Sequence, residues 1–263
     1  MQNERSTNKS SSKKVSVVAG GGRGIGASVA QLLANLGHEV IVLDFPKPTD
    51  FGIYESGSIE GSKHHAIGLD LRDFNAAKKC ANEVFDQFGE VDTLTITAGA
   101  IDGGSSFLEL DGSTVIDAVT KNVISVHNCI KAFVPHLANT SWTKPHTRSV
   151  VALSSVASIK PLRGLASYSV AKGGVRSYLM VAAVELSDIQ VRLNVVAPGS
   201  TRGAMLDASR DLYQLSSSDE FATHHLSKRI IEPEEIAMAV VALHENPAMI
   251  GAEVVVDGGM SRG

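Results

Sequence analysis

The sequence has few of the residues that mark disulfide-rich or metal-binding proteins. Its 263 residues include two cysteines and one tryptophan, and aromatic residues make up 5%. Cys80 and Cys129 form no CxxC motif and have no metal-ligand spacing, so we expect two small reduced residues in or near the core. Reduced thiols are typical of cytosolic proteins, and we therefore expect a cytoplasmic location.

Basic charge and long apolar runs are scarce as well. The formal net charge is −4, without the basic stripe that nucleic-acid binding requires. No run approaches the roughly 18 apolar residues of a membrane helix. The polar N-terminal segment also lacks the apolar centre of a secretory signal. We expect neither a nucleic-acid nor a membrane partner.

The composition is that of a globular protein with a sizeable core. Hydrophobic residues make up 43% of the chain and charged residues 20%. The length suits one large α/β domain. Residues 1–13 are polar and are expected to form a disordered tail, which leaves residues 14–263 as the domain.

Segments with strand and helix patterns alternate along the whole chain. Apolar runs predict strands at residues 15–19, 39–43, 64–69, 91–97, 149–154, 190–196 and 251–256. Helical periodicity predicts helices at residues 25–36, 73–88, 111–138, 167–187 and 233–246. The alternation predicts a single α/β domain: a doubly wound, mostly parallel, Rossmann-like sheet of seven strands with helices on both faces.

Two segments interrupt this alternation. Residues 45–63 contain prolines and glycines where a helix would fit, and we expect a loop. Residues 200–230 follow the carboxyl end of a strand and are expected to form an irregular, partly helical insertion. Ligands bind at these carboxyl ends in open α/β sheets, so this insertion is a candidate lid.

A glycine-rich turn, GGGRGIG at residues 20–26, directly follows the first strand. Glycines allow the backbone to approach a pyrophosphate, and the helix behind the turn offers free N–H groups. A G-x-G-x-x-A register also fits, but G-x-x-x-G-x-G places the first glycine at the end of the strand and is preferred. The expected cofactor residues of this turn are Gly20, Gly22, Arg23, Gly24, Ile25 and Gly26.

Two residues give opposite indications about the cofactor. Asp44 ends the second strand, where a carboxylate accepts hydrogen bonds from the adenosine ribose and repels a 2′-phosphate. Arg23 lies in the glycine turn, where a guanidinium would attract that phosphate. Burying a phosphate against a carboxylate is costly, so we expect NAD, with NADP as the alternative.

Tyr168 and Lys172 are spaced i, i+4 near the start of a predicted helix, which places them on one face. An unperturbed tyrosine has a pKa of about 10, too high for a good base at neutral pH. A nearby lysine ammonium stabilises the phenolate and is expected to lower that pKa. The pair predicts proton transfer by Tyr168.

Taken together, the motifs resemble the short-chain dehydrogenase/reductase family in its single-domain subtype, over about residues 14–260. In family order they are Gly20-x-x-x-Gly24-x-Gly26, Asp70 in LDLRD, Ala98-Gly99, Asn122, Ser155, Tyr168-x-x-x-Lys172, Asn194 with Pro198-Gly199, and Asp257-Gly258-Gly259.

The resemblance implies a catalytic set of four residues. Ser155 would hydrogen-bond the substrate oxygen, although its neighbour Ser154 is an alternative. Tyr168 would be the general acid and base, and Lys172 would bind the nicotinamide ribose. Asn122 would hold a water in a proton relay to Lys172; without the resemblance it is read as a helix-surface amide.

The resemblance also implies further cofactor contacts and reveals departures from the family. Asp70 and Leu71 would lie at the adenine, Ala98 and Gly99 would border the cofactor, and Pro198 and Gly199 would border the nicotinamide. Ala19 stands where the family has Thr, and Thr97 where it has Asn, so the turn and central strands must be braced differently. Gly203 replaces a further Thr, whose carboxamide contact Thr201 is a candidate to supply.

We therefore expect an enzyme that transfers a hydride between NAD and a secondary alcohol or ketone. The alternatives are an NADPH-dependent ketoreductase such as a 3-oxoacyl thioester reductase, a non-catalytic dinucleotide-binding scaffold, and epimerisation or dehydration on a bound nicotinamide. The resemblance implies a homotetramer. Substrate specificity is expected in residues 100–108, 158–165 and 200–230, and the His64-His65 and His224-His225 pairs are not expected to bind metal.

Overall fold

A computed structural model describes residues 13–45, 64–137 and 148–263. Except for Lys13, the predicted N-terminal tail lies outside the described residues. Of the predicted loop 45–63, the structure describes Phe45, and residues 46–63 lie outside the described residues.

The centre of the molecule is one sheet of seven parallel strands in the order β3-β2-β1-β4-β5-β6-β7. The prediction of a doubly wound Rossmann-like sheet is confirmed. The strands are β1 (Val15–Ala19), β2 (Glu39–Asp44), β3 (His64–Gly68), β4 (Thr93–Ile96), β5 (Arg148–Leu153), β6 (Val191–Pro198) and β7 (Glu253–Val256). The strand order reverses between β1 and β4, and ligands of doubly wound folds bind at such a switch point.

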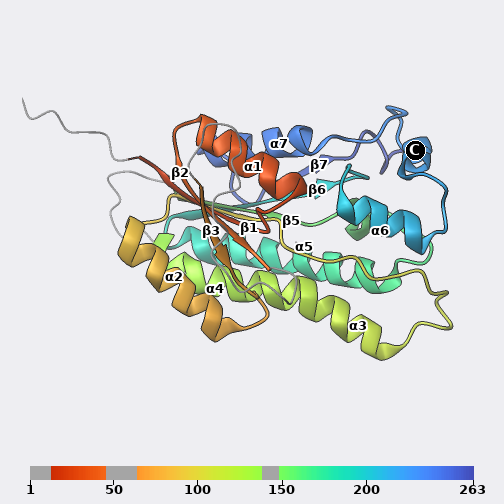
Figure 1. Cartoon of the computed structure of the whole chain (residues 1–263), viewed down its shortest axis with the longest axis horizontal. Coiled ribbons are helices and arrows are strands. Elements are labelled where there is room, and N and C mark those ends of the chain that lie inside the picture. Colours follow the sequence, from red (N-terminus) through yellow and green to blue (C-terminus); the bar gives the residue numbers. More distant parts are fainter. Residues whose placement is uncertain (1–12, 46–63, 138–147) are drawn as a thin grey trace, which may run out of the picture.

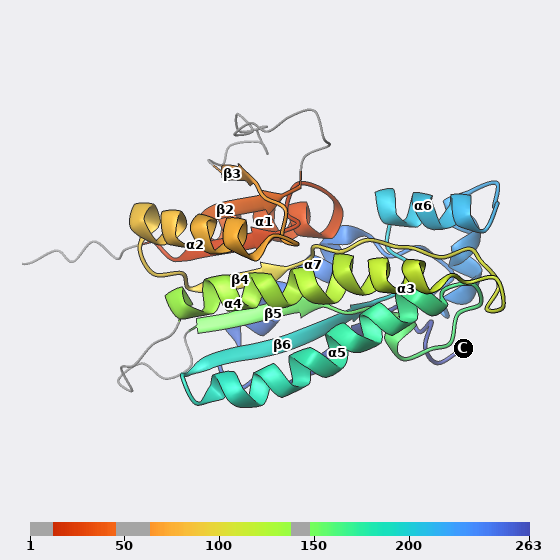
Figure 2. The same ribbon diagram turned by 90° about the horizontal axis from the view of Figure 1, so that it is seen from below.

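Helices cover both faces of the sheet. Helices α1 (Gly24–Asn35) and α7 (Pro233–Glu245) lie on one face, and α2 (Phe74–Phe88), α4 (Ser125–Leu137) and α5 (Ala166–Ser187) lie side by side on the other (Figures 1 and 2). Two separate apolar cores result, one on each face. Both faces of the strands are therefore buried, which explains their continuous apolar sequence.

The helix predicted over residues 111–138 is interrupted. It consists of α3 (Gly112–Val119), a π-helical turn η1 (Thr120–Ile124) and α4, and residue 138 lies outside the described residues. Asp111 starts α3 by accepting a hydrogen bond from the Ser113 N–H. Residues 112–137 are helical as predicted, but the prediction did not include the π-turn, which inserts an extra residue around Asn122; such turns occur often at functional sites.

Cys80 and Cys129 are buried free thiols, as predicted. Burial raises the pKa of Cys80 to about 11, so this thiol is not a nucleophile at neutral pH. Among the described residues, no helix is long and apolar enough to cross a membrane.

The segment after β6 is partly helical, as predicted. It contains α6 (Ala204–Leu212) and η3 (Ser218–His224), which lie beyond the carboxyl ends of the strands (Figure 1). The segment therefore lies at the edge of the sheet where a ligand of this fold would bind.

Candidate active site

A cavity of about 1070 Å³ extends along the carboxyl ends of the strands. It reaches from Asp44 and Asp70 at one end to Tyr168 and Lys172 at the other. Pockets for one small molecule are usually about 300–1,000 Å³. The cavity is therefore large enough for an extended ligand together with a second, smaller molecule.

The glycine turn lines this cavity at the N-terminus of α1. A Cβ atom on Gly26 would lie 2.1 Å from the carbonyl oxygen of Gly20, so only glycine fits there. In the described chain no side chain caps the helix, and its first turn contains no acidic residue. Uncapped N–H groups and the helix dipole favour an anion at this point, so the turn fits the pyrophosphate of a dinucleotide.

Thr97 braces the turn from the end of the central strand β4. Its hydroxyl donates to the carbonyl oxygens of Ala19, at 3.1 Å, and Gly20, at 2.9 Å. The family's hydroxyl is missing at position 19, and a hydroxyl from position 97 reaches the same turn. The departures at these two positions therefore compensate each other.

Asp44 holds the other side of the turn. Its two carboxylate oxygens accept hydrogen bonds from the N–H groups of Gly22 and Phe45, each at 2.8 Å. A carboxylate oxygen can accept more than one hydrogen bond. Asp44 therefore remains able to accept from a ribose hydroxyl while it fixes the turn.

A cation that the sequence analysis missed lies at the same end of the cavity. The guanidinium of Arg72 forms a bidentate pair with Asp70, with its Nη2 2.6 Å from a carboxylate oxygen, and lies 5.4 Å from the ring centroid of Phe45. This arginine holds the pKa of Asp70 below its usual range. The sequence did offer a signal for Arg72: it belongs to the LDLRD motif, and a residue two positions after Asp70 lies at the same strand end.

Ser155, Tyr168 and Lys172 converge at the other end. Ser155 follows β5, and the helix α5 carries Tyr168 and Lys172 on one face. The Ser155 hydroxyl lies beside the Tyr168 phenol and acts to lower its pKa. The Lys172 ammonium donates to the Leu153 carbonyl at 3.2 Å and lies 5.9 Å from the centroid of the Tyr168 ring.

Burial dominates the acid–base properties of this group. It raises the pKa of Tyr168 to about 12, against a smaller lowering by the Ser155 hydrogen bond. It also lowers the pKa of Lys172 to about 8. The expected lowering of the tyrosine pKa by Lys172 is not seen in the protein alone, because desolvation of the phenolate is the larger effect. Tyr168 is thus a neutral phenol that can donate a proton.

Ser154, the alternative to Ser155, points elsewhere. Its hydroxyl accepts from the Ser155 N–H at 2.6 Å and lies 3.2 Å from the Ser158 hydroxyl. It supports the turn that carries Ser155, and no contact joins it to Tyr168 among the described residues.

Asn122 is fully buried, so its alternative interpretation as a helix-surface amide is wrong. Its amide donates to the carbonyls of Ala100 and Ala118, and its oxygen accepts from the Ala100 N–H at 3.3 Å. A Cβ on Gly99 would lie 2.7 Å from this oxygen and 3.1 Å from Lys172 Nζ. Asn122 and Lys172 therefore both pack against the Gly99 backbone, and a relay water would have to bind through an oxygen of Asn122.

The segment after β6 lines the end of the cavity that contains Tyr168. Pro198, Gly199 and Thr201 line the cavity, and the Thr201 hydroxyl donates to the Gly199 carbonyl at 3.0 Å. From α6, the sulfur of Met205 lies 3.8 Å from the Tyr168 hydroxyl. The lid candidate thus contacts the proposed acid directly.

Most of the predicted site residues line the cavity. The exceptions are Gly22, which supports the turn, and Asn122, which lies behind Gly99. Of the expected specificity segments, residues 100–108 contribute Ala100 and Ile101, whereas Phe107 is 80% exposed. Leu162, Arg163, Met205 and Leu206 line the cavity as expected. In the described part of the chain, His, Cys, Asp and Glu form no group suited to a metal.

Comparison with known proteins agrees with this geometry. Residues 19–261 match a family model described as enoyl-(acyl carrier protein) reductase. The chain belongs to the short-chain dehydrogenase/reductase family. It is therefore an oxidoreductase of the kind that uses a nicotinamide cofactor and acts on alcohol and carbonyl groups.

Relatives of this short-chain dehydrogenase/reductase match it over nearly the whole length. An uncharacterized oxidoreductase of Mycobacterium tuberculosis is 30% identical, over 94% of this chain and 92% of its own. A human 3-oxoacyl-[acyl-carrier-protein] reductase is 29% identical, over 94% and 98%. The solved structure of ElxO with NADP bound has a TM-score of 0.82 at 21% identity, covering 94% of this chain and 98% of that one; at this identity the likeness shows the fold.

Proposed function

We propose that this enzyme transfers a hydride between a nicotinamide cofactor and a secondary alcohol or ketone, with Tyr168 as general acid and base. The convergence of Ser155, Tyr168 and Lys172 at one end of the cavity carries the proposal. A non-catalytic scaffold would not need these three buried groups together at one end of the cavity.

The bound nicotinamide would supply the hydride in reduction and accept it in oxidation. In reduction, ketone, reduced cofactor and one proton give alcohol and oxidised cofactor. Ser155 and Tyr168 hydrogen-bond the carbonyl oxygen, and the Tyr168 hydroxyl delivers the proton to it. Lys172 would hold the ribose, and its own position is set by the hydrogen bond to the Leu153 carbonyl and by packing against Gly99. The raised pKa of Tyr168 keeps the phenol protonated before the reaction, and the bound cofactor and Lys172 would have to stabilise the phenolate that forms.

We propose NAD as the cofactor, with the glycine turn, Leu71 and Ala98 as further contacts. The carboxylate of Asp44 is held in place by two N–H groups and faces the cavity where an adenosine ribose would lie. Arg23 and Arg72 line the same end, and they support NADPH-dependent reduction as the second candidate, as does the human 3-oxoacyl-[acyl-carrier-protein] reductase among the relatives.

We also propose a lid at residues 200–230 and a homotetramer. Met205 links the lid to Tyr168. The outer side of α5 exposes Val170, Val181 and Val184, which a second copy of the chain would cover. Location in the cytoplasm remains a prediction from the two reduced thiols.

The decisive experiment on the reaction removes one oxygen atom, the phenol oxygen of Tyr168. Tyr168→Phe should lower the rate of ketone reduction at least about a hundredfold, the usual minimum contribution of a general acid. Its cofactor affinity, measured by titration of NADH fluorescence, should stay within about twofold. A variant that keeps most of its turnover would overturn the role of Tyr168.

A further inference from the structure

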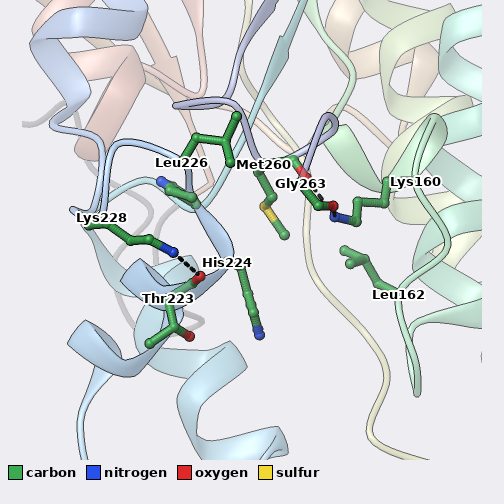
Figure 3. A pocket seen from close by; sticks show the side chains of 9 residues that line it. Lys160, Leu162, Thr223, His224, Leu226, Lys228, Met260 and Gly263 are labelled. Atoms are coloured by element: carbon green, nitrogen blue, oxygen red, sulfur yellow. Dashed lines mark hydrogen bonds between the residues drawn. The ribbon is translucent and has the colours of Figure 1, made fainter.

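A second hollow, of about 390 Å³, adjoins the substrate end of the active-site cavity. Its walls come from the segment around η3, the loop after η2 (Val156–Ser158) and the turn that follows β7. Leu162, His224 and Met260 line both spaces. Figure 3 shows Lys160 and Leu162 on one side, Thr223, His224 and Lys228 on the other, and Met260 between them.

The charged and titratable side chains of this hollow are all basic. Lys160, Lys228 and His224 line it, and no Asp or Glu side chain is among its lining residues. The Lys160 ammonium donates to the carbonyls of Met260, at 2.7 Å, and Gly263, at 2.6 Å, whereas Lys228 donates to the Thr223 carbonyl at 3.3 Å. Because an ammonium has three N–H donors, both lysines retain donors for a ligand.

His225 gives a second and independent indication of a polar ligand. It lines the hollow and is fully buried, yet neither ring nitrogen has a hydrogen-bond partner in the described chain. Buried polar groups in native proteins nearly always have partners, so each exception needs an explanation. A polar atom bound in the hollow would provide one if the His225 ring turned a nitrogen toward it, since both nitrogens are covered in this structure.

Apart from Thr223 and Gly263, the remaining lining is apolar. Leu162, Leu226 and Met260 lie between the basic groups (Figure 3), and the first and last of these also line the active-site cavity. A ligand that fits both features has an apolar body and an anionic end. Its apolar part would pass the side chains that the two spaces share.

We propose that the hollow binds the anionic end, a carboxylate or a phosphate, of a substrate whose carbonyl lies at Tyr168. The substrate class is then a ketone or secondary alcohol with an apolar spacer and a remote anionic group. This inference rests on the proposed function, because that function places the reacting carbon beside Tyr168.

The first test measures binding without chemistry. Isothermal titration calorimetry with octanoate, octyl phosphate and octanamide compares the affinities of a carboxylate, a phosphate and a neutral amide that each carry an eight-carbon chain. We expect one of the anions to bind roughly tenfold or more tightly than octanamide, since hydrogen bonds to charged groups are the stronger ones. Equal affinities for all three would overturn the proposal.

Lysine variants locate the bound anion. Lys228→Met should abolish the preference for the anion, and because Lys228 is exposed the fold should be unaffected. Lys160→Met is a second variant, checked by its melting temperature because Lys160 also holds the closing turn. Lys79→Met on α2 is the matched control, since its side chain is 78% exposed and pairs with Glu83 away from the hollow. A preference that survives both hollow variants would refute the site.

The second test connects binding with turnover. A keto acid should be reduced with a kcat/KM about tenfold above that of its amide, and Lys228→Met should remove this difference through KM. An amide that is reduced as efficiently as the acid would overturn the substrate class while the proposed reaction stands. Selective anion binding with no reduction of any ketone would instead count against the proposed reaction.

Discussion

The hydroxyl of Thr97 donates to the carbonyl oxygen of Gly20 at 2.9 Å, so the end of β4 holds the glycine turn that follows β1. Thr97→Val keeps the shape and removes both hydrogen bonds of this hydroxyl. The loss of a partner for a buried carbonyl costs about 1–3 kcal/mol. We expect cofactor affinity to fall about tenfold and the melting temperature to drop by a few degrees.

Titration of NADH fluorescence and thermal unfolding check this prediction. Thr97→Ser retains the hydroxyl and is the matched control, with an expected affinity within about twofold of the wild type. A Thr97→Val protein that binds NADH as the wild type does would show that the turn needs no brace from β4.

Asp44 is predicted to select NAD over NADP. Asp44→Ala removes the carboxylate that accepts from the Gly22 and Phe45 N–H groups and would meet the ribose. We expect weaker NADH binding and tighter NADPH binding, with the ratio of the two dissociation constants changing at least about tenfold, because a carboxylate no longer opposes the 2′-phosphate.

Parallel titrations with both cofactors measure this ratio. Asp73→Ala is a useful control, since it removes the N-cap of α2 and lowers stability without touching the turn. If the wild type already prefers NADPH, Arg23 and Arg72 outweigh Asp44 and ketone reduction with NADPH becomes the better proposal.

His244 is predicted to make the protein sensitive to acid. It lies in the last turn of α7 and is buried, its Nε2 lies 2.9 Å from the Thr95 hydroxyl, and burial lowers its pKa from 6.5 to about 3. Since the folded pKa lies below the unfolded one, the stabilisation is present above pH 6.5 and is lost as pH falls towards 3. This one group can contribute a slope of up to about 1.4 kcal/mol per pH unit.

Urea unfolding between pH 7 and 4 checks this slope. His244→Gln keeps a polar group near Thr95 and removes the titrating imidazole. Its free energy of unfolding should therefore fall less steeply than that of the wild type as the pH is lowered. Equal slopes for the two proteins would show that other groups cause the acid sensitivity, for example His38 and His225, whose pKa values burial also lowers.

The general fold was predictable because its signals are local. Apolar runs and helical periodicity are repeated within each segment, and their alternation leaves few topologies besides a doubly wound sheet. Six of the seven predicted strands differ from the observed ones by up to two residues at either end. The long helix over residues 111–138 was predicted, but its π-turn around Asn122 was not, because a π-turn depends on the contacts that the Asn122 side chain makes in the folded protein.

The sequence also predicted the glycine turn and the group formed by Ser155, Tyr168 and Lys172. Each of these motifs lies within one strand–turn–helix unit, so a local pattern was enough to find it. The sequence by itself thus determined the fold class, the enzyme family and the residues proposed for proton transfer. The tertiary structure alone decided how Thr97 replaces the missing hydroxyl and that the basic hollow adjoins the active site. These features join segments far apart in the chain, and the order of the strands, rather than any local pattern, brings them together.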